Sequence, residues 1–387
     1  MTTDVILPGA TLGVMGGGQL GRMFVHAAQR MGYFTAVLDP DASSPAGLVS
    51  HHHIHTDYLD FDGLGRLANV SAAITTEFEN VPAEAMSRLA ANRPVAPGAN
   101  ALAIAQDRAQ EKAHFQKCGV PCVPHAVIDT MEQLAVVDIA LLPGLLKTSR
   151  LGYDGKGQVR VATREQLVHA WDDLKHVPCV LEKLLPLAAE ISVVVARSQS
   201  GEMVNLPVQA NLHREGILAV TQVMAGSVPG AVAQEAIDAA KSIAEGLDYV
   251  GVLCVEFFVL QDGSLVVNEM APRPHNSGHY SMDACDVSQF ELQVRALANL
   301  PLMQPRQHSH AIMLNLLGDL WPASGAANST PPWDRVLALP GAHLHLYGKH
   351  TARIGRKMGH LTLTGASPAQ VRDTALQAAT ILGIAPF

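Results

Sequence analysis

The most informative chemistry in this sequence is a pair of glutamates on either side of a predicted hairpin turn. Asp262-Gly263 is a strong signal for a two-residue turn between two apolar strands. Counting outward from that turn places Glu256 directly opposite Glu269, and residues paired in this way have Cβ atoms about 4.5–5.5 Å apart. Two sheltered carboxylates at that distance repel each other unless a cation bridges them or one is protonated.

Magnesium suits such a pair, because Mg²⁺ accepts one or two carboxylates and completes its coordination with nucleotide phosphates. The sequence therefore predicts a site for Mg²⁺, or for Mn²⁺, at Glu256 and Glu269, and with it nucleoside triphosphate chemistry. Asn268, expected to point to the other face, is a weaker candidate ligand. A three-residue loop would shift the register and separate the glutamates, and an exposed hairpin with solvated carboxylates is the alternative.

A glycine-rich segment near the amino terminus could bind a phosphate. Gly16-x-Gly18-x-x-Gly21 follows an apolar run and precedes a predicted helix, whose first N–H groups and dipole attract anions. Asp39 stands about twenty residues further on, where a dinucleotide-binding fold places the carboxylate that holds a ribose. The pattern alone fits a nicotinamide enzyme, another phosphate-bearing ligand, or a tight strand-to-helix turn without a ligand.

A second glycine-rich loop, at residues 151–158, contains Lys156, and Lys147 ends the apolar run before it. Lysines at strand ends and in loops are expected around nucleotide phosphates, and such a loop can close over them and exclude water. The chain lacks the Walker A pattern of P-loop enzymes and the HRD and DFG motifs of protein kinases. Another arrangement of phosphate-binding residues is therefore expected.

Alternating strands and helices are predicted to position the first glycine loop. This order is typical of an α/β unit with a doubly wound parallel sheet, and turn-rich residues at 93–98 close the unit. The predicted elements are strands at 12–15, 34–38 and 72–76 and helices at 19–31 and 82–91.

The rest of the chain predicts an α+β arrangement around the glutamate pair. A charged and polar helix is predicted at 101–117, and strands at 179–184 and 190–197 precede the hairpin. Turn-rich, alternating residues at 335–364 indicate a small β-rich region before a closing helix at 368–382.

Composition limits the classes of function. Of 387 residues, 48% are hydrophobic and 16% charged, as in globular proteins, and the net charge of −8 argues against a nucleic-acid partner. Five scattered cysteines predict neither a disulfide framework nor a zinc site, and no apolar run approaches the ~20 residues that span a bilayer. Without a signal-peptide pattern, we expect a soluble cytoplasmic protein with no membrane partner. The histidine run at 51–55 is expected to be a solvated loop, with metal binding as the alternative.

Several motifs together resemble the ATP-grasp enzymes, and more closely their N5-carboxyaminoimidazole ribonucleotide synthetase family. The resemblance covers nearly the whole chain, and the stretch 273–279 and the carboxy-terminal Gly-Lys motif are specific within the superfamily. The motifs are the glycine loop at 16–23, TTEFEN at 75–80, QDR at 106–108, YDGKGQ at 153–158, EK at 182–183, EFF at 256–258, NEMAPRPHNSGH at 268–279, YGK at 347–349 and GRKMGH at 355–360.

The resemblance implies a reaction and an architecture. ATP, bicarbonate and 5-aminoimidazole ribonucleotide would give the N5-carboxy product, ADP and phosphate in purine synthesis. An ATP-grasp fold with three domains is implied, at residues 1–100, 101–315 (with a lid subdomain at about 120–184) and 316–387. A homodimer that acts on small molecules is also implied.

Nucleotide-binding roles follow from the matched motifs. Arg108 and Lys147 would meet the ATP phosphates, residues 182–184 would contact the adenine, and Glu190 would hold the ribose hydroxyls. The resemblance gives His213 no defined chemical role. The residues implied to bind ATP are Arg108, Lys147, Gly152, Gly155, Gly157, Gln158, Glu182, Lys183, Leu184, Glu190, His213, Asn268 and Glu269.

The resemblance implies that the ligand of the first glycine loop is the ribonucleotide substrate rather than a nicotinamide cofactor. In the family this loop helps to hold the 5′-phosphate of the ribonucleotide. The segment from Lys349 to Lys357 carries four formal positive charges and would neutralise that phosphate, with a solvated surface patch as the alternative. The residues implied to bind the ribonucleotide are Gly18, Gln19, Leu20, Glu77, Asn80, Tyr153, Asp154, Arg273, His275, Asn276, Lys349 and Arg356.

The implied mechanism has two steps. Bicarbonate would attack the γ-phosphoryl group while Mg²⁺, Lys147 and Arg273 spread the developing charge. Carboxyphosphate, or CO₂ released from it, would then carboxylate the exocyclic amine, with Asp154 orienting or deprotonating that amine. The residues implied to be catalytic are Asp154, Lys156, Arg273, His275 and Lys349.

Three other functions stay open on the sequence alone. A formate-dependent glycinamide ribonucleotide transformylase would share the fold and the phosphate chemistry. A NAD-dependent oxidoreductase could be built on the first glycine loop. An inactive nucleotide-binding module is disfavoured by the complete set of metal and phosphate residues.

Overall fold

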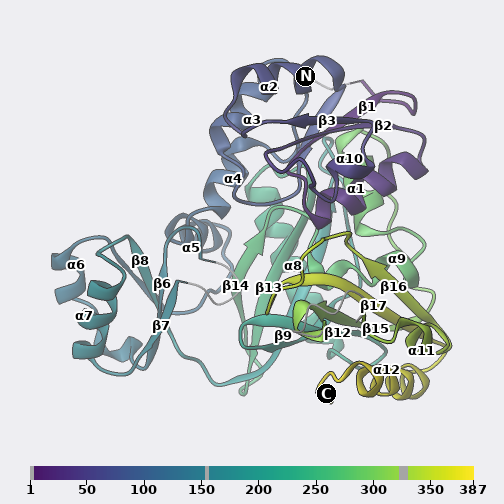
Figure 1. Ribbon diagram of the computed structural model, residues 1–387. Helices are drawn as coiled ribbons and strands as arrows, with labels where there is room; N and C mark the ends of the chain where they lie inside the picture. Colours follow the sequence, from purple (N-terminus) through teal and green to yellow (C-terminus); the bar gives the residue numbers. More distant parts are fainter. Residues whose placement is uncertain (1–3, 153–156, 322–329) are drawn as a thin grey trace.

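The computed structural model describes residues 4–152, 157–321 and 330–387, and Figure 1 shows them as a large body from which a smaller unit projects to one side. The predicted site residues Tyr153, Asp154, Gly155 and Lys156 lie outside the described residues. Among the helices of the described part, none is long and apolar enough to cross a membrane.

A parallel four-stranded sheet with the order β3-β2-β1-β4 forms the amino-terminal part, which confirms the predicted α/β unit. Apolar residues of β1 and β2 are fully buried between the flanking helices. The elements are β1 (Thr11–Met15), α1 (Gln19–Arg30), β2 (Phe34–Asp39), β3 (His52–His55), α2 (Phe61–Val70), β4 (Ala73–Thr76) and α3 (Ala83–Ala90).

The prediction that the histidine run is a loop is wrong. Residues 52–55 form β3, an edge strand that pairs in parallel with β2. Only Ile54 of this strand is buried, so its alternation places an apolar residue in the core between more exposed histidines. The backbone pairing to β2 and the burial of Ile54 account for the strand.

One predicted helix, at 101–117, is two helices in the structure. These are α4 (Ala99–Ala105) and α5 (Arg108–Lys117). Asp107 separates them because it has an extended backbone, with φ of −133°, and its carboxylate accepts hydrogen bonds from Ala109 N and Gln110 N. This is an N-cap, which starts a new helix at Arg108.

The central sheet continues from the predicted hairpin into the carboxy-terminal strands. Its order is β14-β13-β9-β11-β12-β15-β17-β16, with β10 paired to β9. Its strands are β9 (Leu187–Arg197), β10 (Met203–Asn205), β11 (Gln209–Arg214), β12 (Ile217–Val223), β13 (Gly251–Leu260), β14 (Leu265–Ala271), β15 (His310–Leu317), β16 (Ala342–Leu346) and β17 (Lys357–Gly365). The helices that accompany it are α8 (Gly230–Gly246), α9 (Ser281–Ala284), α10 (Gln289–Leu297), α11 (Trp333–Leu337) and α12 (Pro368–Leu382).

Helix α10 joins the central sheet to the amino-terminal sheet. Phe290 and Val294 of α10 share a core with residues of α1. In the same helix, buried Gln293 accepts a hydrogen bond from Val252 N of β13 at 2.6 Å and donates one to Thr75 Oγ1 of β4 at 2.8 Å. This arrangement places residues that follow β1 and β4 around the same cavity as the glutamates of the hairpin.

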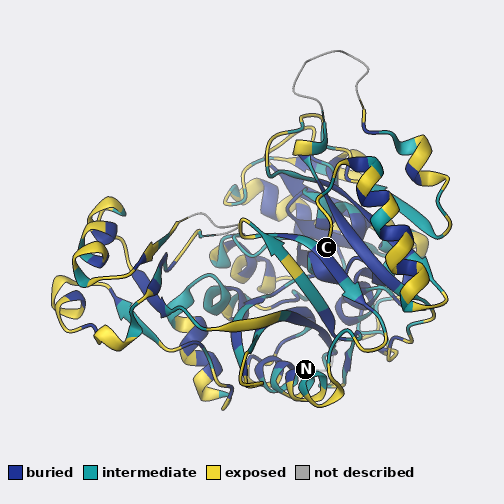
Figure 2. Cartoon of the chain, turned by 90° about the horizontal axis from the view of Figure 1, so that it is seen from below, coloured by how far each residue is buried: buried dark blue, intermediate teal, exposed yellow. Residues whose placement is uncertain are grey.

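The smaller unit is a sheet of order β5-β8-β6-β7 with its own apolar core, which includes Trp171 and Leu146. Figure 2 shows buried residues concentrated in the large body, while the helices of the smaller unit have wide exposed faces. The elements are β5 (His125–Ile128), α6 (Met131–Ala135), β6 (Gly144–Thr148), β7 (Gln158–Val161), α7 (Arg164–Asp173) and β8 (Cys179–Lys183).

Candidate active site

The β13–β14 hairpin pairs Glu256 directly with Glu269, as predicted, but by a different route. The turn has three residues rather than two, because Leu260 N bonds to Ser264 O at 2.9 Å, and Gly263 has the positive φ of 85° that such a turn requires. This longer turn shifts the register by one residue. The predicted turn is therefore wrong, and the predicted pairing of the glutamates is confirmed.

A β-bulge at Asn268 restores the register. Phe257 pairs with Val267 and Glu256 with Glu269, so Asn268 is the extra residue of β14. A bulge breaks the strict alternation of side chains, so Asn268 and Glu269 are not required to point to opposite faces of the sheet. Glu256 Oε1 and Asn268 Oδ1 are buried and accept no hydrogen bond from the residues that the structure describes. Such orphaned oxygens fit a hard cation such as Mg²⁺.

The two carboxyl groups have very different electrostatic surroundings. Burial and the negative charge of Glu269 raise the pKa of Glu256 to about 8. Burial would also raise the pKa of Glu269, but the charges of Arg108 and Lys147 outweigh it and lower this pKa to about 2. Arg108 Nη1 lies 3.0 Å from Glu269 Oε2, which explains part of this effect. Without a bound cation, the pair therefore carries about one negative charge at neutral pH.

A buried ion triad lies beside the glutamate pair. Glu182 contacts Lys112 Nζ at 2.8 Å and Lys147 Nζ at 2.6 Å, and its side chain is 5% exposed. Burial opposes the ionised form, but the two lysines lower the pKa of Glu182 to about 2. Lys112 also donates a hydrogen bond to Asn268 O at 2.7 Å, which ties the triad to the bulge.

Sequence reasoning missed Lys112. The signal that could have found it is its place on helix α5, because Lys112 lies four residues after Arg108 and three before Phe115. Residues at these spacings share one face of a helix, and Phe115 marks that face as buried. A lysine on the face of Arg108 therefore points toward the same site.

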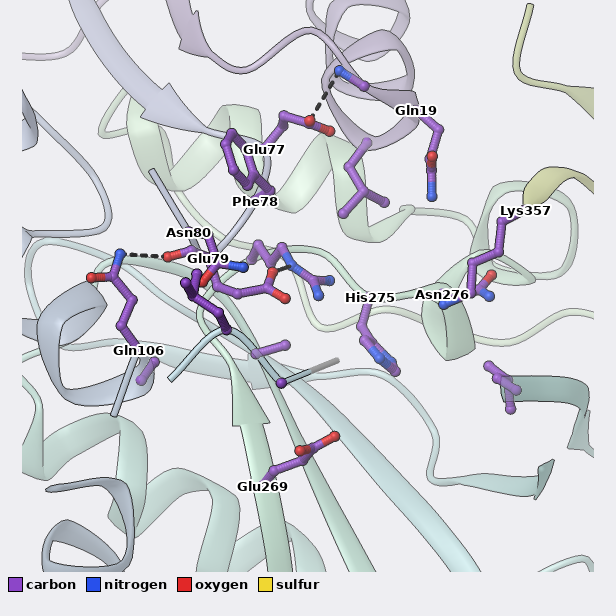
Figure 3. A pocket seen from close by; sticks show the side chains of 18 of the residues that line it. Gln19, Glu77, Phe78, Glu79, Asn80, Gln106, Glu269, His275, Asn276 and Lys357 are labelled. Atoms are coloured by element: carbon purple, nitrogen blue, oxygen red, sulfur yellow. Dashed lines mark hydrogen bonds and ion pairs between the residues drawn. The ribbon is translucent and has the colours of Figure 1, made fainter. Parts of the chain in front are cut away.

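A cavity of about 670 Å³ lies between the hairpin and the amino-terminal sheet. Figure 3 shows His275 between Glu269 and the end of the cavity where Gln19 and Lys357 lie. The predicted residues that line the cavity are Gly18, Gln19, Leu20, Glu77, Asn80, Arg108, Gly152, His213, Glu256, Glu269, Arg273, His275, Asn276, Lys349 and Arg356. The predicted and described residues that do not line it are Lys147, Gly157, Gln158, Glu182, Lys183, Leu184, Glu190 and Asn268.

Arg273 lines the cavity and is held there by Glu79, a second residue that sequence reasoning missed. Arg273 Nε donates a hydrogen bond to the Glu79 carboxylate, and Arg273 Nη1 donates to Pro274 O at 3.1 Å. The side chain of Gln106 fixes the backbone around Glu79 by donating to Glu79 O at 2.6 Å (Figure 3). Glu79 thus orients a cation that the sequence predicted to be catalytic.

Two further residues follow Arg273 on the loop that leads into the 3₁₀ helix η3 (Asn276–Gly278). Burial and the nearby Arg273 charge hold the pKa of His275 well below its usual value, so this imidazole is neutral at pH 7. Its Nδ1 is 2.9 Å from Ser277 Oγ, and its Nε2 is 3.7 Å from Glu256 Oε1. Neither polar side-chain atom of Asn276 has a hydrogen-bond partner among the described residues, although both are buried at the cavity wall.

The first glycine loop is occupied by side chains of the protein itself. Glu77 accepts hydrogen bonds from Gly18 N at 2.9 Å and from Gly21 N at 3.1 Å. A Cβ at Gly16 would lie 2.6 Å from Glu77 Cγ, and one at Gly18 would lie 2.5 Å from Glu77 Oε1. These glycines are therefore needed for the close approach of Glu77 rather than of a pyrophosphate.

The Asp39 carboxylate also accepts hydrogen bonds from the protein itself. The donors are Gly17 N at 2.6 Å, Asp41 N at 2.8 Å and Tyr58 Oη at 2.7 Å. Asp39, which would hold the ribose of a nicotinamide cofactor, is therefore already hydrogen-bonded within the protein. This disfavours the hypothesis of a NAD-dependent enzyme. Gln19 N and Leu20 N, in the first turn of α1, make no hydrogen bond within the described chain and face the cavity region.

Comparisons with known proteins agree with this geometry. Three family models match: the ribonucleotide synthetase preATP-grasp domain at residues 9–106, the ATP-grasp domain at 113–290 and the phosphoribosylaminoimidazole carboxylase C-terminal domain at 311–374. The N5-carboxyaminoimidazole ribonucleotide synthase of Brucella melitensis is 44% identical over 369 residues, covering 94% of this chain and 98% of that protein. The chain belongs to the N5-carboxyaminoimidazole ribonucleotide synthase family.

Other members of this synthase family show the same extent of similarity. The Bacillus subtilis synthase is 40% identical over 363 residues, covering 94% of this chain and 93% of that protein. A solved ADP complex of an N5-carboxyaminoimidazole ribonucleotide synthetase has a TM-score of 0.90 at 39% identity, covering 99% and 98% of the two chains. The Aspergillus clavatus synthase, solved with ADP and 5-aminoimidazole ribonucleotide, has a TM-score of 0.88 at 30% identity, covering 97% and 98%. The chain is therefore an ATP-grasp ligase, and the fold class predicted from its sequence is confirmed.

In this synthase the residues predicted to bind ATP come from both the smaller unit and the central sheet. His213 Nδ1 is 2.7 Å from Glu190 Oε2, which joins two of them. Lys147 and Gln158 are paired across β6 and β7, and Gly157 has a positive φ of 69°. Lys183 N and Leu184 N donate to Pro124 O and Pro143 O, which fixes the end of β8.

Proposed function

We propose that this chain carboxylates the exocyclic amine of 5-aminoimidazole ribonucleotide with bicarbonate in purine biosynthesis, and cleaves ATP to ADP and phosphate as it does so. The observation that carries the proposal is one cavity with two chemically distinct ends. The paired Glu256 and Glu269 stand at one end, and the first turn of α1 and the cationic segment from Lys349 stand at the other. Arg273 and His275 also line this cavity, and His275 lies between its two ends (Figure 3).

The glutamate end takes the nucleotide in this proposal. Mg²⁺ would be held by Glu256, Glu269 and Asn268. The two carboxylates face each other, and Glu256 Oε1 and Asn268 Oδ1 are buried without a hydrogen-bond partner among the described residues. When bound, the ion supplies positive charge to the ATP phosphates during phosphoryl transfer. Arg108, now paired with Glu269, and Lys147, now paired with Glu182, are close enough to exchange these partners for phosphate oxygens.

The other end takes the ribonucleotide phosphate. The N–H groups of Gln19 and Leu20 offer the dipole end of α1 to an anion, with Lys349 and Arg356 as cations beside them. Gly18 N already binds Glu77, so we assign the loop contact to Gln19 and Leu20 rather than to Gly18. Glu77 and Asn80 also line the cavity, and we assign them to contacts with the ribonucleotide.

Arg273 and His275 act on the reacting groups in the proposed mechanism. The Arg273 guanidinium binds bicarbonate and stabilises the negative charge that develops as bicarbonate attacks the γ-phosphoryl group. A neutral His275 can donate a hydrogen bond to carboxyphosphate without repelling Arg273. The proposed roles of Tyr153, Asp154 and Lys156, which include handling of the amine proton, belong to residues outside the described ranges.

The test is phosphate release from ATP by the purified full chain, with bicarbonate and 5-aminoimidazole ribonucleotide added separately and together. We expect fast release only with both, and transfer of label to the amine from ¹⁴C-bicarbonate but not from ¹⁴C-formate. Glu269→Gln should reduce this rate by at least about 10²-fold while the circular dichroism spectrum is unchanged. Glu202→Gln, at an exposed carboxylate on the turn before β10, is the matched control and should be fully active. Formate transfer, or near-normal turnover of Glu269→Gln, would refute the assignment.

We also propose that the protein is a cytoplasmic homodimer with domains at 1–100, 101–315 and 316–387. The three family-model matches support this division, because their boundaries fall near residues 106–113 and 290–311. The sheet itself runs without interruption from the second region into the third. Light scattering on the purified chain, which gives the mass in solution, would distinguish a dimer from a 41.1 kDa monomer.

A further inference from the structure

A cluster of histidines and one aspartate lies at the edge of the central sheet, and no step of the proposed reaction uses it. Asp283 of α9, His345 of β16 and His360 of β17 each offer one ligand atom, and these atoms lie within 4.8 Å of one another. We propose that this cluster, with His343 of β16 as a fourth ligand, is a binding site for a divalent transition-metal ion of the zinc class. The site is distinct from the predicted magnesium site at Glu256 and Glu269.

The sheet register brings the imidazoles together. His345 and His360 are directly paired across the antiparallel strands β16 and β17, with ring centroids 4.5 Å apart. His343 lies two residues before His345 and therefore on the same face of the sheet. Asp283 closes the cluster from α9, with its carboxylate oxygens 2.9 Å from His345 Nε2 and 3.8 Å from His343 Nδ1. Two histidines on one strand and a third on its neighbour thus converge on one carboxylate.

Hydroxyl groups hold the outer nitrogen of two of these rings. Tyr347 Oη is 3.0 Å from His360 Nδ1, and Thr364 Oγ1 is 3.1 Å from His343 Nε2. This is the pattern of metal-binding histidines, in which a partner on one ring nitrogen orients the other toward the ion. His360 is fully buried, and its remaining Nε2 has no hydrogen-bond partner in the described part of the chain. A buried unpartnered nitrogen is costly, and a metal bond would satisfy it.

The ligand set selects the class of ion. Three imidazoles and one carboxylate suit Zn²⁺ or Co²⁺ in four-coordinate geometry, whereas Mg²⁺ prefers oxygen ligands alone. The rings of His345 and His360 are stacked at 15°, so one ring must rotate before both can direct a lone pair at a single ion. His343 is 41% exposed on its side chain, which leaves a path for the ion to enter. Metal binding would cross-link α9, β16 and β17 immediately before the Tyr347–Lys349 segment.

The experiment is a titration of the metal-free, untagged full chain with Co²⁺, in the absence of nucleotide and Mg²⁺. We expect one equivalent of Co²⁺ to bind with the strong visible absorption of a four-coordinate site, and one equivalent of Zn²⁺ to displace it. His345→Ala should remove this absorption. Asp283→Asn, which keeps a polar group beside His345, and Thr364→Val, which removes the hydroxyl from His343, should each weaken binding by about 10-fold or more. All variants are first checked for a wild-type circular dichroism spectrum, and Asp283→Asn decides the question if His345→Ala does not fold.

Two controls separate this site from the other metal ligands of the chain. Glu269→Gln, at the proposed magnesium site, should keep the full Co²⁺ signal. A double variant in the histidine run, His52→Ala with His55→Ala, should keep it as well. Loss of the signal in either control, or an unchanged signal in both His345→Ala and Asp283→Asn, would overturn the proposal. So would the absence of any bound equivalent at Co²⁺ concentrations well above that of the protein.

Discussion

At the scale of single residues, Glu182 shows how the protein fixes two lysine side chains beside the glutamate pair. One carboxylate, almost fully buried, is shared by Lys112 and Lys147. Removing one partner of a buried ion pair typically costs about 3–5 kcal/mol, because it leaves an uncompensated charge away from water. Here the removal of Glu182 would leave two such charges. The triad therefore stabilises the structure and holds the Lys147 ammonium group beside Glu182.

We predict that Glu182→Gln lowers the free energy of unfolding by about 3–5 kcal/mol at pH 7. The pKa of Glu182 in the folded protein, about 2, lies below its ordinary value of 4.5. Its contribution is therefore fully present above pH 4.5 and is lost as the pH falls toward 2. The difference between the wild type and the variant should shrink over that range. Urea unfolding at pH 7, 4.5 and 3 measures it.

The control for this prediction is Glu202→Gln, which removes an exposed carboxylate and should change the free energy of unfolding by less than about 0.5 kcal/mol. A Glu182→Gln protein as stable as the wild type at pH 7 would contradict the account of the triad. So would a stability difference that is independent of pH between 7 and 3.

At the scale of elements, the hairpin depends on two local irregularities that compensate each other. The three-residue turn offsets the strands by one residue, and the bulge at Asn268 removes that offset. Gly263 makes the turn possible, because its φ of 85° is a conformation that residues with a Cβ rarely adopt. The pairing of Glu256 with Glu269 thus relies on the conformation of a residue seven positions away from the first of them.

We predict that Gly263→Ala lowers the free energy of unfolding by about 1 kcal/mol through backbone strain. No atom lies within 4 Å of the position where the new Cβ would be built, so steric contact does not contribute. Gly65→Ala is the matched control, because Gly65 also has open space around it but lies in helix α2 without a positive φ. There alanine should stabilise the protein by up to about 1 kcal/mol. Equal effects of the two substitutions on thermal unfolding would refute the argument.

The same irregularities show how far the sequence alone can predict these elements. The Asp262-Gly263 signal located the hairpin correctly, and the glutamate pairing came out right although the assumed turn was wrong. Helix α2 was missed because Gly63 and Gly65 weaken its helical pattern, while its N-cap Asp60 holds Gly63 N in the structure. Local patterns predict where elements occur, but bulges and caps depend on neighbours that only the fold brings together.

The site residues were likewise predictable only where a local motif marks them. Glu256, Glu269 and Arg273 stand out in the sequence because their motifs are local. Glu79 and Lys112 act through contacts to residues that are more than a hundred positions away in the sequence. Glu79 accepts a hydrogen bond from Arg273, and Lys112 donates one to Asn268 O. No local pattern carries such pairings. They required the arrangement of α5, β4 and β14 in space.

At the scale of the whole molecule, the cavity is made where the amino-terminal sheet meets the central sheet. Gln293 ties the two sheets together through the backbone of β13 and the side chain of Thr75. The pair of Glu79 and Arg273 makes a second connection across the same boundary, inside the cavity. The position of Arg273, which we propose to be catalytic, is therefore set by a residue that follows β4 of the other sheet.

We predict that Glu79→Gln lowers kcat by about 10²-fold, because an Arg273 displaced by even about 1 Å no longer meets the reacting groups. The KM for ATP should change little, since the nucleotide is proposed to bind at the glutamate end. The control is Glu84→Gln, which breaks an exposed pair with Arg88 on α3 and should leave kcat unchanged. A kcat for Glu79→Gln within about twofold of the wild type would show that Glu79 does not position Arg273.

The fate of the oxygen atoms of bicarbonate tests whether bicarbonate attacks ATP in this cavity. If bicarbonate attacks the γ-phosphoryl group in this cavity, one of its oxygens remains on phosphorus when the carboxyl group moves to the amine. With ¹⁸O-labelled bicarbonate, ATP and 5-aminoimidazole ribonucleotide, mass spectrometry of the released phosphate should then find one ¹⁸O atom per molecule. Phosphate that carries oxygen only from the solvent, at the same rate of product formation, would contradict the account.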